Sequence, residues 1–260
     1  MIQFAANLTM LFNEADFLDR FEAAAKAGFK GVEYLFPYDF DKTDLADRLK
    51  ANGLRQVLFN TPAGDWAKGE RGLACRPDRV DEFREGVARA IDYARALGCT
   101  QLHCMAGLAP EGADAAAVRK TYVENLRHAA GEMGKAGIRC LMEMINTRDI
   151  PGFYLNTSAQ AEALMKEIGS DNVWMQYDIY HMQIMEGDLA PTMQRLLPRI
   201  SHMQLADTPG RNEPGTGEIN YAFLFAHLDR IGYKGWIGCE YKPAKTTLEG
   251  LGWIKPYLKA

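Results

Sequence analysis

The feature that most restricts the fold of this chain is an alternation of two patterns, repeated eight times. Short runs of apolar, β-branched and aromatic residues recur, each followed by a longer segment with the period of an amphipathic helix. The predicted strands are residues 2–8, 31–36, 55–60, 100–106, 138–145, 172–179, 200–207 and 235–241. Eight such units in a row predict an α/β fold, a closed (β/α)8 TIM barrel with parallel strands.

The segments between these runs carry the signals of helices. Most end in glycine, which is typical of a helix C-terminus, and Ser158 and Asn220 are predicted N-caps. A doubly wound open sheet is the alternative, but it usually has fewer units and a glycine-rich first turn, which this chain lacks. The clearest helical segments are residues 15–28, 81–98, 119–137, 158–169 and 220–232.

Length and composition narrow the class of protein. A chain of 260 residues suits one barrel of about 250 residues, so residues 1–260 are predicted to form a single TIM-barrel domain. A net charge of -4 weighs against a nucleic-acid partner. The chain has neither a long apolar run nor a basic N-terminal region, and its five cysteines are scattered, so we expect a reduced, cytoplasmic protein without a membrane partner.

Polar residues stand near the C-terminal ends of four predicted strands, each about one strand–helix unit from the next. They are Glu143, Asp178, Gln204 and Glu240. Because parallel barrel strands end at one rim, these side chains are expected to meet there. Three buried carboxylates require a compensating cation or buried Lys and Arg side chains, and the strands themselves supply none. An all-oxygen set suits Mg²⁺ or Mn²⁺ better than zinc. The alternative is that some of these side chains point outward and cap neighbouring helices.

Three histidines and two loops are further candidates for the site. His181 is placed to contact a substrate oxygen or to make a structural hydrogen bond, His202 is expected one layer deeper in the barrel, and His103 is a further inward-facing candidate. The loop at residues 210–218, GRNEPGTGE, is expected to hold Arg211 and Glu213 over the barrel mouth. The loop at 61–77 is predicted to be a lid or a variable surface loop. Nucleophile-elbow and phosphate-binding glycine motifs are absent from the sequence.

Several longer motifs spread over nearly the whole chain are distinctive. They are FAANLTMLFNE, FPYD, PAGDWAKGERG, DIYHMQIMEGDL (178–189), HMQLADTPGRNEPGTGEINY (202–221) and GCEYKP (238–243). These motifs resemble the hydroxypyruvate isomerase family, which belongs with the xylose-isomerase-like TIM barrels, alongside ketose 3-epimerases and the AP-endonuclease IV group.

The resemblance implies roles for the residues already selected. It implies a divalent-metal site, a proton-transfer pair formed by Glu143 and Glu240, and a substrate pocket lined by His181 and Arg211. The implied metal ligands are Glu143, Asp178, Gln204 and Glu240.

The resemblance also implies a reaction, the metal-assisted interconversion of hydroxypyruvate and tartronate semialdehyde (2-hydroxy-3-oxopropanoate) through an enediolate. The substrate class is then a small hydroxy or oxo acid. The alternatives are a 2-oxotetronate isomerase or ketose 3-epimerase with the same chemistry, a metal-dependent AP endonuclease-like phosphodiesterase, and a non-catalytic sugar-acid-binding protein. Five histidines and the negative net charge weigh against the phosphodiesterase. The sequence leaves the oligomeric state open, a homo-oligomer included.

Three positions depart from the family pattern. Phe59 stands where an LHN-type motif has histidine, Leu108 stands where a GK-type motif has lysine, and the EPIN motif reads EMIN at residues 143–146. Losing a histidine and a lysine from the predicted pocket would remove partners for a substrate carboxylate. The departures therefore leave the identity of the substrate open.

Overall fold

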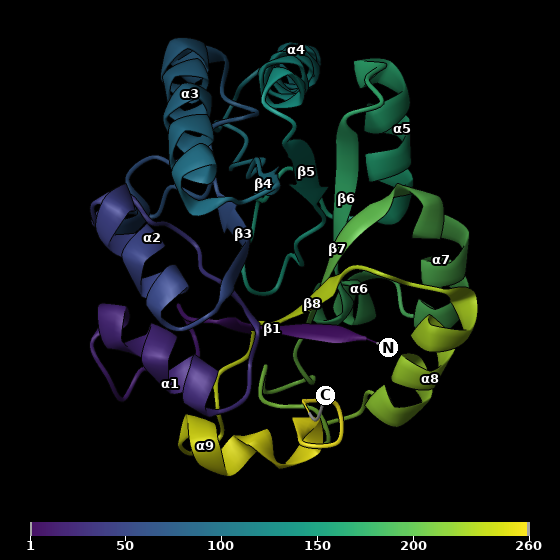
Figure 1. The fold of residues 1–260 in the computed structure, drawn as a ribbon. Helices are drawn as coiled ribbons and strands as arrows, with labels where there is room; N and C mark the ends of the chain where they lie inside the picture. The colour runs from purple at the N-terminus through teal and green to yellow at the C-terminus, as the bar shows by residue number, and fades with distance from the viewer. Residues whose placement is uncertain (1, 259–260) are drawn as a thin grey trace.

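A computed structural model describes residues 2–258 and shows a closed barrel of eight parallel strands (Figure 1). The strands pair in chain order, and β1 closes the barrel against β8. The fold class and the eight predicted strands are confirmed, although most strands are shorter than the apolar runs because the runs continue into loops. Their bounds are β1 Gln3–Asn7, β2 Gly31–Glu33, β3 Arg55–Asn60, β4 Gln101–His103, β5 Arg139–Glu143, β6 Val173–Asp178, β7 Ile200–Leu205 and β8 Trp236–Cys239.

Helices surround this barrel and cover its outer face (Figure 1). The five predicted helical segments correspond to α1, α3, α4, α5 and α8. Among residues 2–258, no helix has the length and apolar character needed to cross a membrane. The α-helices are α1 Arg20–Lys26, α2 Lys42–Ala51, α3 Val80–Leu97, α4 Ala115–Lys135, α5 Ser158–Ile168, α6 Ile179–Met185, α7 Leu189–Leu196, α8 Tyr221–Ile231 and α9 Thr247–Gly250.

One of the two predicted N-caps is correct. The side chain of Asn220 accepts a hydrogen bond from the backbone N–H of Phe223 at 3.1 Å and caps α8. The prediction for Ser158 is wrong, because Thr157 has the extended backbone of a cap and its side chain accepts from Gln160 N. A serine that follows a threonine at a helix start satisfies the same sequence pattern, and only the backbone angles separate the two.

The barrel interior changes from apolar to polar along the strands. Ala5, Val57 and Leu141 form a small apolar cluster against Trp174 and Trp236. The ends of β5 and β6, and the positions just beyond β8, instead carry buried acids. Because the active sites of this architecture lie at the C-terminal ends of the strands, the polar end is where a site is expected.

Candidate functional site

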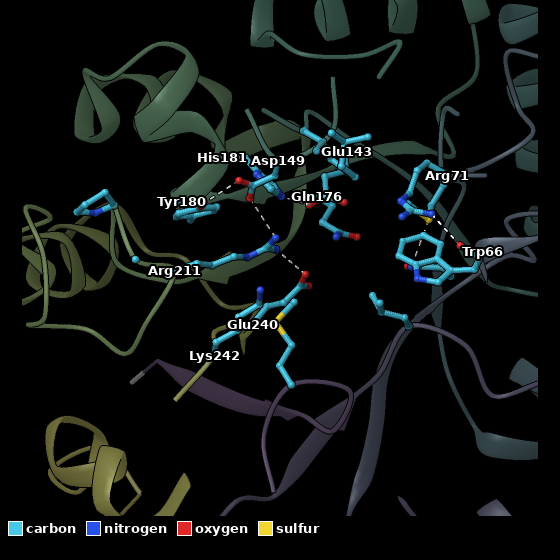
Figure 2. Close-up of a pocket in the computed structure, with 18 residues that line it drawn as sticks. Trp66, Arg71, Glu143, Asp149, Gln176, Tyr180, His181, Arg211, Glu240 and Lys242 are labelled. Carbon is cyan, nitrogen blue, oxygen red and sulfur yellow. Dashed lines mark hydrogen bonds and ion pairs between the residues drawn. The ribbon is translucent and has the colours of Figure 1, made fainter. Parts of the chain in front are cut away.

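A cavity of about 650 Å³ opens at the C-terminal ends of the strands, which form the barrel mouth (Figure 2). Four of the six sequence-predicted site residues line it, while Asp178 and Gln204 are buried outside its lining. The lining includes Glu143 at the end of β5, His181 on α6, Arg211 in the loop after β7 and Glu240 just after β8. Other lining residues are Met10, Leu35, Asn60, Trp66, Arg71, Met105, Ile145, Asp149, Ile150, Gln176, Tyr180, Pro209, Gly210 and Lys242.

Glu143, Asp178 and His181 form one buried group at the mouth. Each offers a ligand atom within 4.8 Å of those of the other two. His181 Nε2 lies 3.5 Å from Asp178 Oδ2 and 4.0 Å from Glu143 Oε1. The structure thus brings three predicted site residues from β5, β6 and α6 to one point.

Asp178 combines the two roles that the sequence left open for these acids, a ligand at the barrel rim and a cap of the next helix. It is the last residue of β6 and the N-cap of α6, and its Oδ1 accepts from Tyr180 N at 2.8 Å. Its Oδ2 is buried and forms no hydrogen bond with any residue that the structure describes, although Arg211 Nη2 lies 3.9 Å away. A buried carboxylate oxygen without a partner is costly, so this atom is open to a ligand.

Glu240 has different surroundings. Its Oε1 accepts a hydrogen bond from Arg211 Nη2 at 2.8 Å, and its Oε2 accepts from Asn7 Nδ2 at 3.3 Å and from Gln204 Nε2. Glu240 therefore has a cationic partner supplied by the chain itself. Figure 2 shows the Arg211 side chain reaching into the pocket toward Glu240.

The amide of Gln204 links the mouth to a deeper polar layer. Its nitrogen also donates to Glu33 Oε1 at 2.8 Å, and its oxygen accepts from Gln176 Nε2 at 2.6 Å. The oxygen that a cation would need is therefore engaged by Gln176 in this structure. The assignment of Gln204 as a metal ligand stays a prediction.

Glu33 is a buried acid that the sequence interpretation missed. It ends β2 and accepts from His202 Nε2 at 2.7 Å, so His202 does lie in the deeper layer, as predicted. Gly238 on β8 makes room for this carboxylate, since a Cβ at that position would overlap it. A lone glutamate inside the apolar run GVEYLF was the available signal.

Burial raises the pKa values of the three acids at the mouth. It raises the pKa of Glu143 well above its usual range, with the charges of Glu240 and Asp178 adding to the effect. Burial also raises the pKa of Asp178 to about 6 and that of Glu240 to about 8, although Arg211 opposes both shifts. Ionising all three acids would place more negative charge at the mouth than Arg211 alone compensates.

Arg211 remains a cation in this setting. Burial lowers its pKa, but the carboxylates of Glu240, Asp178 and Asp149 outweigh burial, so the pKa is raised overall. Its Nη1 lies 3.3 Å from Asp149 Oδ2, and its guanidinium lies 5.0 Å from the ring centroid of Tyr180. The guanidinium is therefore fixed at the mouth by charge and by ring contact.

The two histidines nearest Glu143 are neutral. Burial lowers the pKa of His103 to about 3, with His202 adding to the shift. Burial also lowers the pKa of His181 well below its usual range, with Arg211 and His103 adding to the shift. These rings can exchange hydrogen bonds with Glu143 or with a ligand, but they do not compensate its charge.

The mouth as a whole fits a divalent cation. Glu143 and Asp178 present buried carboxylate oxygens, one of them unpartnered, next to a cavity. Oxygen donors of this kind suit a hard cation, which would also favour the charged form of each acid. The residues present therefore fit a metal site.

The carboxylate of Asp207 holds the charged loop after β7 in one conformation. Its carboxylate accepts from the backbone N–H groups of Thr208, Gly215, Gly217 and Ile219 at 2.9–3.0 Å. Gly217 is required for close approach, because a Cβ there would overlap the carbonyl oxygen of Thr208. One buried acid therefore holds the loop that carries Arg211.

The expectation that Glu213 lies over the mouth is wrong. Its Oε2 accepts from Ala244 N at 2.9 Å, and it is not among the residues that line the cavity. It ties the loop after β7 to the segment after β8. The sequence does not distinguish these roles, since both place a charged residue near the rim.

The long loop after β3 lies over the mouth and contributes Trp66 and Arg71 to the cavity lining. The Arg71 guanidinium lies 4.0 Å from the Trp66 ring centroid, and Trp66 is 37% exposed. Figure 2 shows the two residues across the pocket from Arg211. The loop therefore brings a further cation and an aromatic surface to the entrance.

Two of the three departures from the family pattern, Phe59 and Leu108, lie outside the cavity lining, and the loss of a substrate-carboxylate partner at these positions stays a prediction. Phe59 is buried in the core, where its ring centroid lies 6.4 Å from that of Tyr34 and 6.3 Å from that of Tyr38. The next residue, Asn60, faces the cavity, as expected from the alternation of a strand. Leu108 pairs with Phe153 and also lies outside the lining.

The chain is similar to known proteins in both sequence and structure. The family model described as xylose isomerase-like TIM barrel matches residues 21–257. The chain is 54% identical to the hydroxypyruvate isomerase of Escherichia coli (strain K12), over 99% of this chain and 100% of that protein. It is 52% identical to the 2-oxo-tetronate isomerase of Cupriavidus necator, over 99% of each. A solved structure described as AP endonuclease, family 2, from Brucella melitensis superposes with a TM-score of 0.97 at 49% identity and covers 99% of both chains.

Proposed function

The chain belongs to the xylose isomerase-like TIM barrel family, and we propose that it interconverts hydroxypyruvate and tartronate semialdehyde. The observation that carries the proposal is a pair of buried glutamates, Glu143 and Glu240, at one cavity of the barrel mouth. Relatives at 54% and 52% identity carry isomerase names, which supports an aldose–ketose type of isomerisation. The substrate is a small hydroxy or oxo acid.

The reaction moves one proton between adjacent carbons. A base removes a proton from C3 of hydroxypyruvate, the electron pair forms the C2–C3 double bond of an enediolate, and a proton returns to C2. A second proton passes from the C3 oxygen to the C2 oxygen, so the carbonyl group moves from C2 to C3 without any net oxidation. This chemistry needs a base close to the carbon and stabilisation of charge on oxygen.

Glu143 and Glu240 are the proposed proton-transfer pair. They come from strands three apart, which places one at each side of the mouth. Burial raises the pKa of Glu240 to about 8, which suits a group that must both accept and return a proton near neutral pH. Arg211 is proposed to pair with the substrate carboxylate, because its planar guanidinium presents two parallel donors.

A divalent cation, Mg²⁺ or Mn²⁺, is the proposed cofactor. Glu143 and Asp178 would hold it, with Gln204 and Glu240 as the further predicted ligands. When bound, it would supply positive charge to the oxygens of the enediolate. The loop that carries Trp66 is proposed to cover the mouth and exclude water from the reactive intermediate.

A 2-oxotetronate isomerase is the second candidate, and the size of the cavity favours it. At roughly 30 Å³ per water-sized group, the seven non-hydrogen atoms of hydroxypyruvate fill about a third of the cavity. The 650 Å³ available would also hold a four-carbon acid. The relative from Cupriavidus necator bears that activity in its name.

A substrate panel tests the proposal. The purified protein is assayed with hydroxypyruvate, four-carbon 2-oxo acids and free ketoses, with Mn²⁺ or with a chelator, and the kcat/KM values are compared. We expect turnover of a 2-oxo acid, with hydroxypyruvate preferred, and loss of turnover with the chelator. A preference for free ketoses would contradict the proposal, as would nicking of abasic DNA without any isomerase turnover.

A further inference from the structure

Asn146 lies just beyond β5 and contacts His181 in a way that fixes the orientation of both side chains. Its Nδ2 lies 2.6 Å from His181 Nδ1. Its Oδ1 accepts from the backbone N–H groups of Arg148 at 3.0 Å and Asp149 at 2.7 Å. Because two fixed donors hold the amide oxygen, the amide nitrogen is the atom that faces the imidazole.

This orientation determines where the proton of His181 resides. An amide NH₂ group can only donate, so His181 Nδ1 must present its lone pair. A neutral imidazole carries its proton on the other nitrogen, Nε2. That nitrogen points toward the mouth, 3.5 Å from Asp178 Oδ2 and 4.0 Å from Glu143 Oε1.

We propose that Asn146 is a positioning residue that fixes the Nε2–H tautomer of His181, so that this ring donates a hydrogen bond to a substrate oxygen and does not bind the metal. A nitrogen that carries hydrogen has no lone pair in the ring plane for a cation. The carboxylates of Glu143 and Asp178 then remain as the ligands within the buried group. The donor role rests on the proposed function, whereas the tautomer does not.

A second pair across the mouth shows the opposite arrangement. His103 Nδ1 lies 3.1 Å from Asn60 Oδ1, while Asn60 Nδ2 donates to Met105 Sδ at 3.6 Å. An amide oxygen only accepts, so His103 carries its proton on Nδ1. Two asparagines therefore impose opposite tautomers on two buried histidines, and Asn60 provides a matched control.

The direct test is nitrogen NMR of the imidazoles in the full-length, metal-free protein. In the wild type, we expect a protonated shift at His181 Nε2 and an unprotonated shift at Nδ1; His181→Gln identifies these signals by deleting them. Asn146→Asp keeps an oxygen for the two backbone donors and places an acceptor at Nδ1, so the proton should move to Nδ1. Asn60→Asp should leave the His181 signals unchanged. A wild-type Nδ1–H tautomer would overturn the proposal, and so would an unchanged pattern in folded Asn146→Asp.

Two further readouts separate tautomer control from simple structural support. With the substrate that the wild type turns over best, Asn146→Asp should lower kcat about 10² to 10³-fold, the loss seen when a preorganised donor is removed, with a smaller change in KM. Its affinity for Mn²⁺, measured by titration without substrate, should rise because Nε2 then presents a lone pair. An equal loss in Asn146→Asp and Asn60→Asp, with no change in Mn²⁺ affinity, would contradict the proposal. The NMR result stands even if the substrate proves to be a different one.

Discussion

The two glutamates at the mouth, alike in the sequence pattern, have opposite surroundings in the fold. Glu240 receives hydrogen bonds from Arg211, Asn7 and Gln204. Glu143 lies 3.5 Å from His103 Nδ1 and 4.0 Å from His181 Nε2, and burial lowers the pKa of both rings. One carboxylate therefore has a counter-charge built into the chain, while the other is placed where an external cation can compensate it. The difference indicates why a metal fits beside Glu143 although an arginine already occupies the mouth.

The largest effect is expected from substituting the two glutamates. These substitutions test whether both residues transfer protons although their surroundings differ. Glu143→Gln and Glu240→Gln should each lower isomerase turnover by about 10² to 10⁴-fold, since each removes a proton-transfer group. Steady-state kinetics on hydroxypyruvate measures this. Glu132→Gln on the exposed face of α4 is the control and should keep native turnover. Near-native turnover in both mouth variants would contradict the assignment.

Removal of the built-in counter-charge should have the next largest effect. Arg211→Ala leaves the buried Glu240 without its cationic partner and removes the proposed carboxylate clamp. We expect a loss of about 2–5 kcal/mol in transition-state binding, which is roughly 30-fold to several thousand-fold in kcat/KM. Arg211→Lys keeps the charge but not the paired donors, so it should recover only part of the loss. Full recovery by lysine would show that charge alone suffices.

The pH dependence of stability provides a third test. In the folded, metal-free protein, the pKa of Glu240 is raised to about 8. The pKa of Glu143 is raised well above its usual range. The folded state therefore binds more protons than the unfolded state, and the free energy of unfolding should fall as the pH rises from 7 to 9. The buried histidines act in the opposite direction, but mainly below their unfolded pKa of about 6.5, outside this window.

Adding Mn²⁺ to the same unfolding measurement provides a further test. Mn²⁺ at about 100 times its Kd should raise the free energy of unfolding by about 2.7 kcal/mol at pH 8, because it binds the folded state. Denaturant unfolding with Mn²⁺ or with a chelator at each pH measures both effects. Stability of the chelated protein that rises between pH 7 and 9 would contradict the picture of uncompensated buried acids.

The smallest expected effect distinguishes the glutamates from one another. In the metal-free protein at pH 8, Glu143→Gln should raise the free energy of unfolding by about 1–3 kcal/mol, since it removes a buried acid that forms no ion pair with Lys or Arg within residues 2–258. Glu240→Gln should give a smaller gain, because Arg211 already offsets part of the burial cost. Chemical denaturation of the two variants is the measurement. A larger gain for Glu240→Gln would reverse the comparison.

The barrel and the residues at its mouth could be predicted because both depend on periodicity. A strand of period 2 followed by a helix of period 3.6 fixes which residues end at the rim, so Glu143, Asp178 and Glu240 could be selected from spacing alone. The direction of a side chain within that rim is a different matter. Phe59 and Asn60 are neighbours, yet only Asn60 faces the cavity.

The contacts that were missed are those that the periodicity of strands and helices does not specify. Glu33 contacts His202 and Gln204 across the barrel, and Asp207 binds the backbone of its own loop rather than a ligand. Glu213 has the charge expected of a mouth residue but anchors a neighbouring segment. Local sequence carries no information about which of several nearby partners an acid will contact.

The most direct test of the central claim is diffraction from crystals soaked with Mn²⁺, with data collected for its anomalous signal. We expect a single strong peak at the mouth, within coordination distance of oxygens from Glu143 and Asp178. An empty mouth in crystals that contain manganese elsewhere, or carboxylates turned away from one another, would contradict it.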